Sequence, residues 1–390
     1  MIIEISEVRW LTIEDACRRL ISARRTSKGR CSMAQQGKRQ QQWANIWITV
    51  TLTALLTACA SVSPPPPTTA AWSATPLASP ISSLTPSPTP AYTHAPTPST
   101  TPVPSNTPTP QPSTRVVILI IIDGARWIET FGDRTHEFIP HLANDLAPLG
   151  AINTQFYNEA STWSVPAHAA IVTGAWQDIP NTGRVRPTAP TIFEYYRKAT
   201  GAPADEAVFV HGSYIEPVLT YSTHPDYGAD FGARMFFSDY LNPPYDDGMW
   251  ANARQVLADL HPHLLMISLL DPDEAAHEGQ WDGYRLAIQH DDEIIWDLWQ
   301  QLQADPFYAG QTTLIVTNDH GRYCGGGWQQ HGGSDECNRH VMFLAVGPEI
   351  PPGLVVAQRR TLRDIAPTIG YLLGFHTPLA EGEVMAELYE

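Results

Sequence analysis

The side chains that could carry out chemistry in this chain are carboxylates and imidazoles that follow apolar segments. Asp123 comes directly after the run 116–122, and Asp319-His320 comes directly after 313–317 with one Asn between. Carboxylates and imidazoles are common ligands of divalent cations, and several of them at the ends of apolar segments favour a metal site. The candidate ligands are Asp123, Asp273, His277, Asp319, His320 and His331.

Asp273 and His277 are four positions apart, so on a helical turn both would point the same way and could bind one cation. The same pattern often arises by chance, and then indicates a helix N-cap followed by a solvent-facing histidine. The pattern favours a metal site here because the chain has other candidate ligands, which include His331 with Gly332 after it.

Ser164 is the candidate nucleophile. It lies just before Pro166, a residue typical of the first turn of a helix, where backbone N–H groups have no partner. The positive end of such a helix would lower the pKa of the hydroxyl and attract an anion such as a phosphate. The plainer interpretation is an ordinary helix N-cap. The metal ligands elsewhere in the chain favour the nucleophile.

Three apolar segments would position these residues as strands of a parallel sheet. They run over 116–122 (VVILIII), 263–270 and 313–317, and each leads into carboxylates, where open α/β sheets bind ligands. Helical patterns follow at 191–199, 284–302 and 362–373. The predicted fold class is α/β, with a mostly parallel central sheet sandwiched between helices, in a single catalytic domain that spans 115–390.

Composition separates this domain from what precedes it. The chain has 390 residues and 35 prolines, of which 16 lie in residues 59–114, a stretch without any charged residue. Such a stretch cannot bury a core and is predicted to be a disordered tether. Residues 115–390 carry 15 basic and 36 acidic groups, a formal charge of −21, so no nucleic-acid partner is expected. Residues 225–250, rich in aromatic residues, Gly, Pro and Asp, are interpreted as an ordered insertion over one sheet edge, beside a substrate pocket.

Residues 43–56 form a mostly apolar run behind two basic residues, which is typical of a secretory signal rather than of a spanning helix of about 20 residues. The sequence Leu-Thr-Ala-Cys59 that ends this region resembles a bacterial lipobox. The resemblance implies that Cys59 is the lipidated first residue of an exported, membrane-anchored bacterial lipoprotein, at the cell surface or in the periplasm. Residues 1–58 would be the upstream segment and signal peptide, with Met33 as the expected true start.

Cys324 and Cys337 would be the cysteines left in the folded domain after export. An even pair in an oxidising compartment favours a disulfide, which would close a loop around His331. Metal binding by both sulfurs is the alternative. It is disfavoured because no second Cys pair or suitably spaced Cys/His set accompanies them.

Taken in order, these motifs resemble the alkaline phosphatase superfamily, and most closely its nucleotide pyrophosphatase/phosphodiesterase branch. The resemblance spans essentially all of residues 115–390, and it rests on the ordered set rather than on one motif. The motifs are Asp123-Gly after a strand, Ser164-x-Pro-x-His with Thr173-Gly174, Asp273-x-x-x-His277, Asp319-His320-Gly321, His331-Gly332 before 343–348, and 364–374.

The resemblance implies a hydrolase of phosphate esters that holds two zinc ions. Ser164 would attack phosphorus, and water would then hydrolyse a phosphoseryl intermediate. The substrates would be small-molecule, lipid or nucleotide esters, as diesters, pyrophosphates or monoesters. One zinc would be held by Asp123, Asp319, His320 and Ser164, and the other by Asp273, His277 and His331.

Further positions refine this expectation. The family places an amide near the phosphate, and Asn181 is the candidate, with a turn residue as the plainer interpretation. His168 stands where sulfatases have Arg, which argues against sulfatase maturation, and it is interpreted as bracing the helix start. His331 is preferred to His340, which begins a predicted strand. The rival functions are a sulfatase or phosphonate hydrolase on the same scaffold, and a non-catalytic metal-containing surface lipoprotein.

Overall fold

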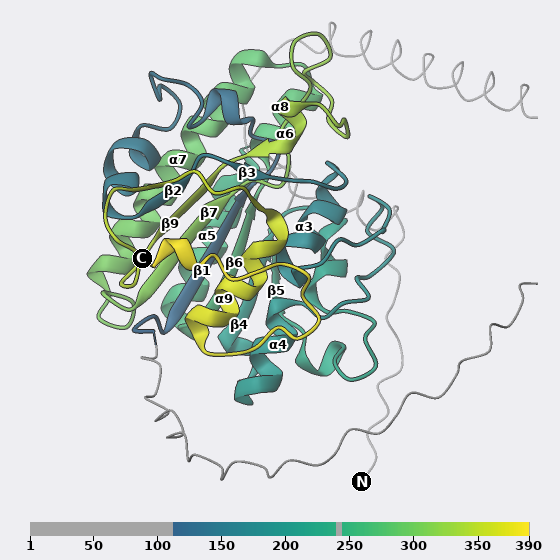
Figure 1. The fold of residues 1–390 in the computed structure, drawn as a ribbon, viewed down its shortest axis with the longest axis vertical. Helices are drawn as coiled ribbons and strands as arrows, with labels where there is room; N and C mark the ends of the chain where they lie inside the picture. The colour runs from purple at the N-terminus through teal and green to yellow at the C-terminus, as the bar shows by residue number, and fades with distance from the viewer. Residues whose placement is uncertain (1–111, 239–243, 390) are drawn as a thin grey trace, which may run out of the picture. The chain divides into compact units, whose positions relative to one another are not determined.

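β1 (Val116–Ile122) lies at the centre of the fold because its seven residues are all apolar and all buried. It pairs in parallel with β6 (Leu264–Leu269) on one side and with β7 (Thr312–Thr317) on the other. The structure, a computed structural model, describes residues 112–238 and 244–389 (Figure 1). Cys59, Met33 and the expected tether as far as residue 111 lie outside this range, so the expectations placed on them stay predictions.

Within the described residues, eight strands form one sheet in the order β10-β2-β9-β7-β1-β6-β4-β5. β4 and β5 extend the parallel half, whereas β9 runs antiparallel to β7 and to β2. The further strands are β4 (Ala207–His211), β5 (Arg234–Phe237), β9 (Phe343–Val346), β2 (Ala151–Asn153) and β10 (Leu354–Val356). A small second sheet contains β11 (Arg360–Thr361), β3 (Phe156–Tyr157) and β8 (His340–Val341).

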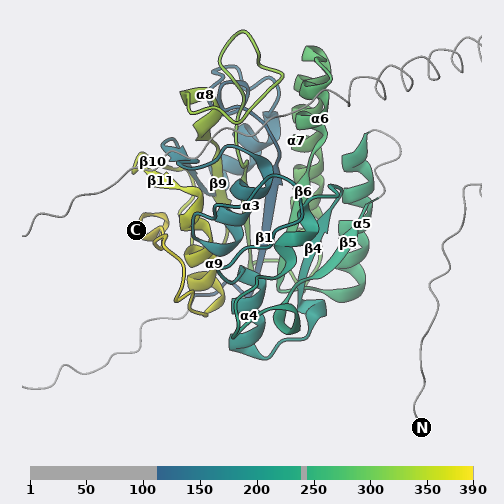
Figure 2. The ribbon, with the colours of Figure 1, turned by 90° about the vertical axis from the view of Figure 1, so that its right-hand side faces the viewer.

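Helices cover both faces of the sheet, and β1 shows why. Its residues 117, 119 and 121 pack into one apolar core, and its residues 116, 118, 120 and 122 pack into a second core, because successive strand side chains point to opposite faces. Figure 2 shows the two helical layers on either side of β1. One layer contains α3 (Ser164–Thr173), α4 (Ile192–Thr200) and α9 (Ile365–Leu373), and the other contains α5 (Tyr245–Leu260) and α7 (Trp281–Ala304). The predicted fold class is therefore confirmed.

Two short helices complete the frame of the site. α6 (Asp271–His277) follows β6 with one residue between, and α8 (Glu336–Arg339) precedes β8. Within the described residues, no helix is both long enough and apolar enough to span a bilayer.

The interpretation of 225–250 as an insertion is wrong for its described parts. Residues 234–237 are β5, which pairs in parallel with β4 and forms the edge of the main sheet, and residues 245–250 begin α5. This segment therefore continues the strand–helix alternation. The sequence concealed that role because an edge strand can be short and unburied: β5 has four residues, Arg-Met-Phe-Phe, and none of them is buried.

Candidate functional site

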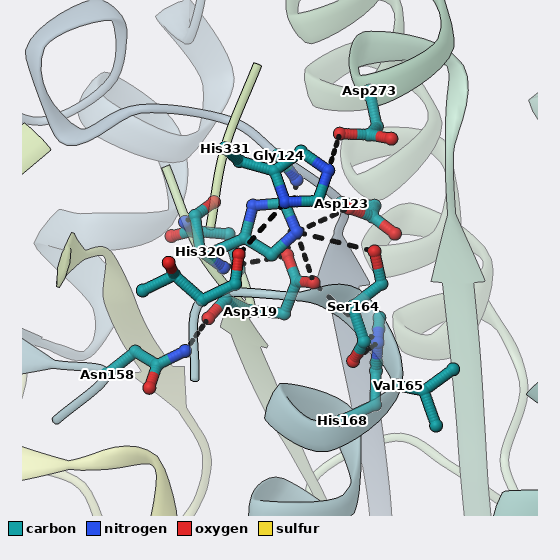
Figure 3. Close-up of polar contacts among 12 residues, drawn as sticks. Asp123, Gly124, Asn158, Ser164, Val165, His168, Asp273, Asp319, His320 and His331 are labelled. Carbon is teal, nitrogen blue, oxygen red and sulfur yellow. Dashed lines mark hydrogen bonds and ion pairs between the residues drawn. The ribbon is translucent and has the colours of Figure 1, made fainter. Parts of the chain in front are cut away.

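The candidate ligands meet because three neighbouring parallel strands end at the same edge of the sheet. Asp123 directly follows β1, Asp319 follows β7 after one residue, and α6, which carries Asp273 and His277, follows β6. β1 lies between β6 and β7, so the three segments are adjacent in space. Figure 3 shows the side chains of Asp123, Asp319, Asp273 and Ser164 gathered around the imidazoles of His320 and His331.

The first ligand group comprises Asp123, Asp319 and His320, all buried, with ligand atoms within 4.8 Å of one another. Nε2 of His320 lies 3.1 Å from Oδ2 of Asp319 and 3.5 Å from Oδ1 of Asp123. Nδ1 of the same ring donates to the Gly321 carbonyl at 3.0 Å, which fixes the ring and leaves Nε2 free to bind a cation.

The second ligand group comprises Asp273, His277 and His331. Nε2 of His277 lies 3.1 Å from Oδ2 of Asp273 and 3.1 Å from Nε2 of His331, and Nε2 of His331 lies 3.7 Å from Oδ1 of Asp273. Nδ1 of His331 donates to the Thr162 carbonyl at 2.9 Å, so its Nε2 also faces the site. The rings of His320 and His331 stack at 3.9 Å between centroids, which makes the two groups adjacent.

Two sets of side chains could each hold a divalent cation, because their ligand atoms lie within 4.8 Å of one another: Asp123, Asp319 and His320, and Asp273, His320 and His331. Oδ1 of Asp123 and Oδ2 of Asp319 are buried without a hydrogen-bond partner, although a buried polar atom normally has one. Burial raises the pKa of Asp123 well above its ordinary value, with a further rise from the charges of Asp319 and Asp273, and burial also raises the pKa of Asp319. Burial lowers the pKa of His320, which favours the neutral, ligating imidazole. A bound cation would compensate the negative charge of the buried carboxylates. A donor set of carboxylate oxygens and imidazole nitrogens suits zinc.

Arg322 is a functional candidate that the sequence interpretation missed. Its side chain is fully buried, and Nη2 forms an ion pair with Oδ1 of Asp273 and donates to the Asp273 carbonyl at 2.9 Å. Burial alone would raise the pKa of Asp273, but the hydrogen bond with His277 and the charge of Arg322 outweigh it and lower the pKa. The available signal was position, because Arg322 directly follows Asp319-His320-Gly321.

Ser164 lies where the nucleophile was expected, with one correction. It is the first residue of α3, not the residue before the helix, because Trp163 has the extended conformation of the N-cap and accepts from Ala167. Pro166 is tolerated two residues further in because N–H groups of the first turn need no partner within the helix. Oγ of Ser164 lies 3.3 Å from Nε2 of His320, which brings the hydroxyl to the first ligand group.

Asn181 also reaches the site. Its Oδ1 accepts the N–H of Val165 at 2.8 Å, so it caps α3 from another segment. A cavity of about 180 Å³ opens here, and it contains members of both ligand groups. Its lining comprises Asp123, Trp163, Ser164, Asn181, Ser213, Ile215, Leu270, Asp273, Glu274, His277 and His331.

His168 braces the start of α3, as interpreted from the sequence. Nδ1 donates to the Ser164 carbonyl at 2.9 Å, and burial lowers its pKa to about 4. The sequence analysis also missed a buried cluster of His168, Glu216 and His211. The Glu216 carboxyl lies 3.7 Å from Nε2 of His168 and 3.7 Å from Nδ1 of His211. Burial raises the pKa of Glu216 to about 8, so it is largely protonated at neutral pH. Glu216 and His211 carried no motif signal.

The remaining predicted positions are placed as follows. His340 lies outside the two ligand groups: its Nε2 faces the Thr154 carbonyl at 3.1 Å, and its ring stacks on Trp127. Cys324 and Cys337 form a disulfide, with 5.3 Å between Cα atoms, and the loop that it closes carries His331.

No family model matches the chain. Two curated proteins match over short segments. The 2,3-bisphosphoglycerate-independent phosphoglycerate mutase of Gracilaria tenuistipitata var. liui is 30% identical over 118 residues, 29% of this chain and 22% of that protein. The phosphopentomutase of Herpetosiphon aurantiacus is 29% identical over 112 residues, 29% of this chain and 26% of that protein. The matched segments thus span about a quarter of either relative.

Solved structures match most of the described chain. A 2-O GAG sulfatase superposes with a TM-score of 0.54 at 14% identity, over 71% of this chain and 74% of its own. The phosphonate monoester hydrolase from Silicibacter pomeroyi gives 0.53 at 16% identity, over 71% and 76%. A protein of the alkaline phosphatase superfamily from Vibrio parahaemolyticus gives 0.53 at 14% identity, over 70% of either chain.

The fold is thus that of an α/β protein with two groups of candidate metal ligands at the ends of neighbouring parallel strands. More particularly, the chain has the fold of the alkaline phosphatase superfamily, as the sequence motifs implied. The solved relatives include sulfatases and phosphonate hydrolases, so the likeness does not single out the nucleotide pyrophosphatase/phosphodiesterase branch.

Proposed function

We propose that this chain is a metal-dependent hydrolase of phosphate esters that acts through a phosphoseryl intermediate at a two-zinc site. One observation carries the proposal: Ser164, at the N-terminus of α3, lines the same cavity as Asp123 of the first ligand group and all three members of the second. Substrates are diesters, pyrophosphates or monoesters of small molecules, lipids or nucleotides.

The residues divide the work by position. Asp123, Asp319 and His320 would hold one zinc beside Ser164, and Asp273, His277 and His331 would hold the other. Bound zinc lowers the pKa of a coordinated hydroxyl or water and stabilises negative oxygens. Oγ of Ser164 then forms a bond to phosphorus as the ester oxygen leaves on the side of Asp273. Water next displaces Ser164 and releases phosphate or a phosphomonoester.

The start of α3 would also favour the anionic phosphoryl group, independently of any bound cation. The dipole of α3 favours a negative charge at its N-terminus, where Ser164 is the first residue of the helix. His168 fixes the first turn through the Ser164 carbonyl, and Asn181 fixes it through the Val165 N–H. The nucleophile is therefore held in place before substrate binds.

A sulfatase or phosphonate monoester hydrolase is the second candidate, because proteins with those activities share this fold at TM-scores of 0.54 and 0.53. The transferred groups have similar shapes and differ in charge. His168, buried at the position that holds Arg in sulfatases by the sequence resemblance, disfavours the sulfatase.

One experiment separates these functions. Zinc-loaded protein is assayed side by side with an aryl phosphate, a bis-aryl phosphate and an aryl sulfate, with and without a chelator. We expect chelator-sensitive hydrolysis of one of the phosphate esters to be fastest. Faster turnover of the sulfate would favour the second candidate, and no turnover of any ester by protein with two bound zinc ions would favour a binding protein.

We further propose that the domain is carried on a lipid-anchored tether that begins at Cys59. The lipobox resemblance and the apolar run 43–56 support this proposal. Mass spectrometry of the mature protein from a bacterial host should find a diacylated N-terminal cysteine peptide, which Cys59→Ser should abolish. A mature protein that retains residues 1–32 would contradict both the processing and the start at Met33.

A further inference from the structure

Trp163 departs from two general preferences at the residue before the candidate nucleophile. It is the N-cap residue of α3, where Ser, Thr, Asp and Asn are preferred because their side chains accept a hydrogen bond from the first turn. The indole makes no such bond, and Asn181 supplies the acceptor instead. Trp163 is also a large apolar side chain with 41% of its surface exposed, at the cavity that contains Ser164. Departures of this kind are expected at functional positions.

The indole is held by its surroundings. The residue before it, Thr162, accepts from His331 through its carbonyl and donates from Oγ1 to the Gly333 carbonyl at 2.8 Å. Gly332 lies against the ring: a Cβ at this glycine would come within 2.6 Å of the indole, and its φ of 93° also disfavours other residues. The backbone on both sides therefore keeps a flat aromatic surface at the cavity.

The position of the ring identifies the part of a substrate that it would contact. The Trp163 ring packs edge-on against His331, with 4.8 Å between centroids and an interplanar angle of 65°. His331 belongs to the second ligand group, on whose side the ester oxygen leaves in the proposed mechanism. Apolar side chains of Ile215 and Leu270 line the same cavity. A leaving group would thus pass beside the indole.

We propose that Trp163 is a specificity-determining residue that stacks on a flat ring in the leaving group of the ester. This inference rests on the proposed function, since it assumes that an ester is cleaved beside Ser164. An aromatic ring and the apolar face of a sugar ring share the chemistry that an exposed indole recognises, whereas a methyl group offers too little area to stack.

Binding of uncleaved analogues tests the proposal without turnover. Zinc-loaded protein is titrated in a calorimeter with phenylphosphonate and with methylphosphonate, whose carbon–phosphorus bonds the proposed displacement does not break. We expect the phenyl compound to bind about tenfold more tightly, the effect of roughly 1.4 kcal/mol of stacking. Trp163→Ala should abolish this preference, and Trp163→Phe should keep most of it. Glucose 1-phosphate and methyl phosphate are then compared as inhibitors of ester hydrolysis. Stronger inhibition by glucose 1-phosphate would show that a sugar ring also gains affinity from the indole.

Tyr371→Ala is the matched control, because Tyr371 is 38% exposed on α9 and does not line the cavity that contains Ser164. Equal affinity for ring-bearing and methyl compounds, or an equal loss of both in Trp163→Ala, would overturn the role of Trp163 and leave the proposed function standing. Failure of the zinc-loaded protein to bind either phosphonate or to hydrolyse any ester would overturn both.

Discussion

At the scale of single residues, the proposed site needs a nucleophile and ligands for cations. Ser164 would supply the nucleophile, and the six candidate ligands would hold the cations. Oγ of Ser164 lies 3.3 Å from Nε2 of His320, whereas the candidate ligands lie after β1 and β7, on α6, and in the loop before α8. Loss of this one oxygen should therefore remove the nucleophile and leave most of the cation-binding groups in place.

Ser164→Ala should accordingly lower turnover of the best phosphate ester by at least about 10³-fold, because no other hydroxyl of the cavity is placed at the helix start. Zinc content measured by mass spectrometry should stay near that of the parent protein. Ser161→Ala, three residues upstream, is the matched control and should keep full activity. Unchanged turnover in Ser164→Ala would exclude the proposed nucleophile.

Arg322 contacts Asp273 and does not line the cavity, so we expect it to be a positioning residue that acts through Asp273. Its guanidinium contacts the Asp273 carboxylate and the Asp273 carbonyl, and Nη1 donates to the Gln329 carbonyl at 2.7 Å. Gln329 lies two residues before His331, so one side chain connects the segments that carry two ligands of the second group. A planar fork can make these contacts together, and an ammonium group cannot.

Arg322→Lys should therefore weaken retention of the second zinc by about 10- to 100-fold, the usual effect of losing a residue that orients a ligand. A chelator titration monitored by metal content would measure the loss, with the more exposed Arg339→Lys as control. If both variants retain zinc as the parent does, Arg322 has no positioning role.

At the scale of elements, the loop between β7 and α8 carries His331 and is closed by the Cys324–Cys337 disulfide. Gly325, Gly326 and Gly327 lie inside it, and glycine gives a chain more conformational freedom to lose on folding. The crosslink limits that freedom in the unfolded chain, and the Thr162 contact then fixes the imidazole.

The double variant Cys324→Ser, Cys337→Ser should lower the free energy of unfolding by about 3 kcal/mol, as the chain-entropy model gives for a loop of this length. Urea denaturation measures the change, and reduction of the parent protein should reproduce it. Activity should fall with it, because His331 loses its fixed loop. Equal stability of oxidised and reduced parent protein would contradict this role.

The same elements show what the sequence could predict. The VVILIII run predicted both ends of β1, because a strand buried on both faces must be continuously apolar. The same rule predicted β6 and β7 to within one residue at each end. The candidate ligands Asp123, Asp273, Asp319 and His320 were predicted from their places after those strands. His277 was predicted from its spacing to Asp273, and His331 from the family resemblance. β5 was missed because its exposed, mixed sequence is that of an edge strand.

Residues that act only through distant partners left no local pattern. Glu216 lies on a 3-10 helix, Glu216–Thr220, and joins His168 and His211 only when three separate segments pack together. Arg322 pairs with Asp273, 49 positions earlier. The predicted start of α3 was one residue too late. Asn181 caps the helix from another segment, so the N-cap residue Trp163 needs no capping side chain of its own.

At the scale of the whole molecule, buried acids away from the site make the stability depend on pH. Asp246 at the start of α5 and Asp291 on α7 are fully buried, and Asp246 accepts the N–H groups of Leu270 and Asp271 at 2.8 and 2.9 Å. Burial raises the pKa of Asp246 to about 7, with a further rise from Asp271. Burial raises the pKa of Asp291 well above its ordinary value, with a further rise from Asp246.

Because these folded-state pKa values lie above the unfolded value of about 4, folding binds protons. Their contribution to stability is complete below about pH 4 and is lost as the pH rises through about 7, the pKa of Asp246.

Asp291→Asn replaces one carboxyl by an amide of the same shape that does not ionise. The variant and the parent should have similar melting temperatures near pH 5, and the variant should be higher by on the order of 5 °C at pH 8.5. Thermal unfolding followed by circular dichroism measures both, and Asp282→Asn, at a side chain 83% exposed on the same helix, should follow the parent at each pH. Parallel pH profiles for Asp291→Asn and the parent would show that this pair is not the source of the dependence.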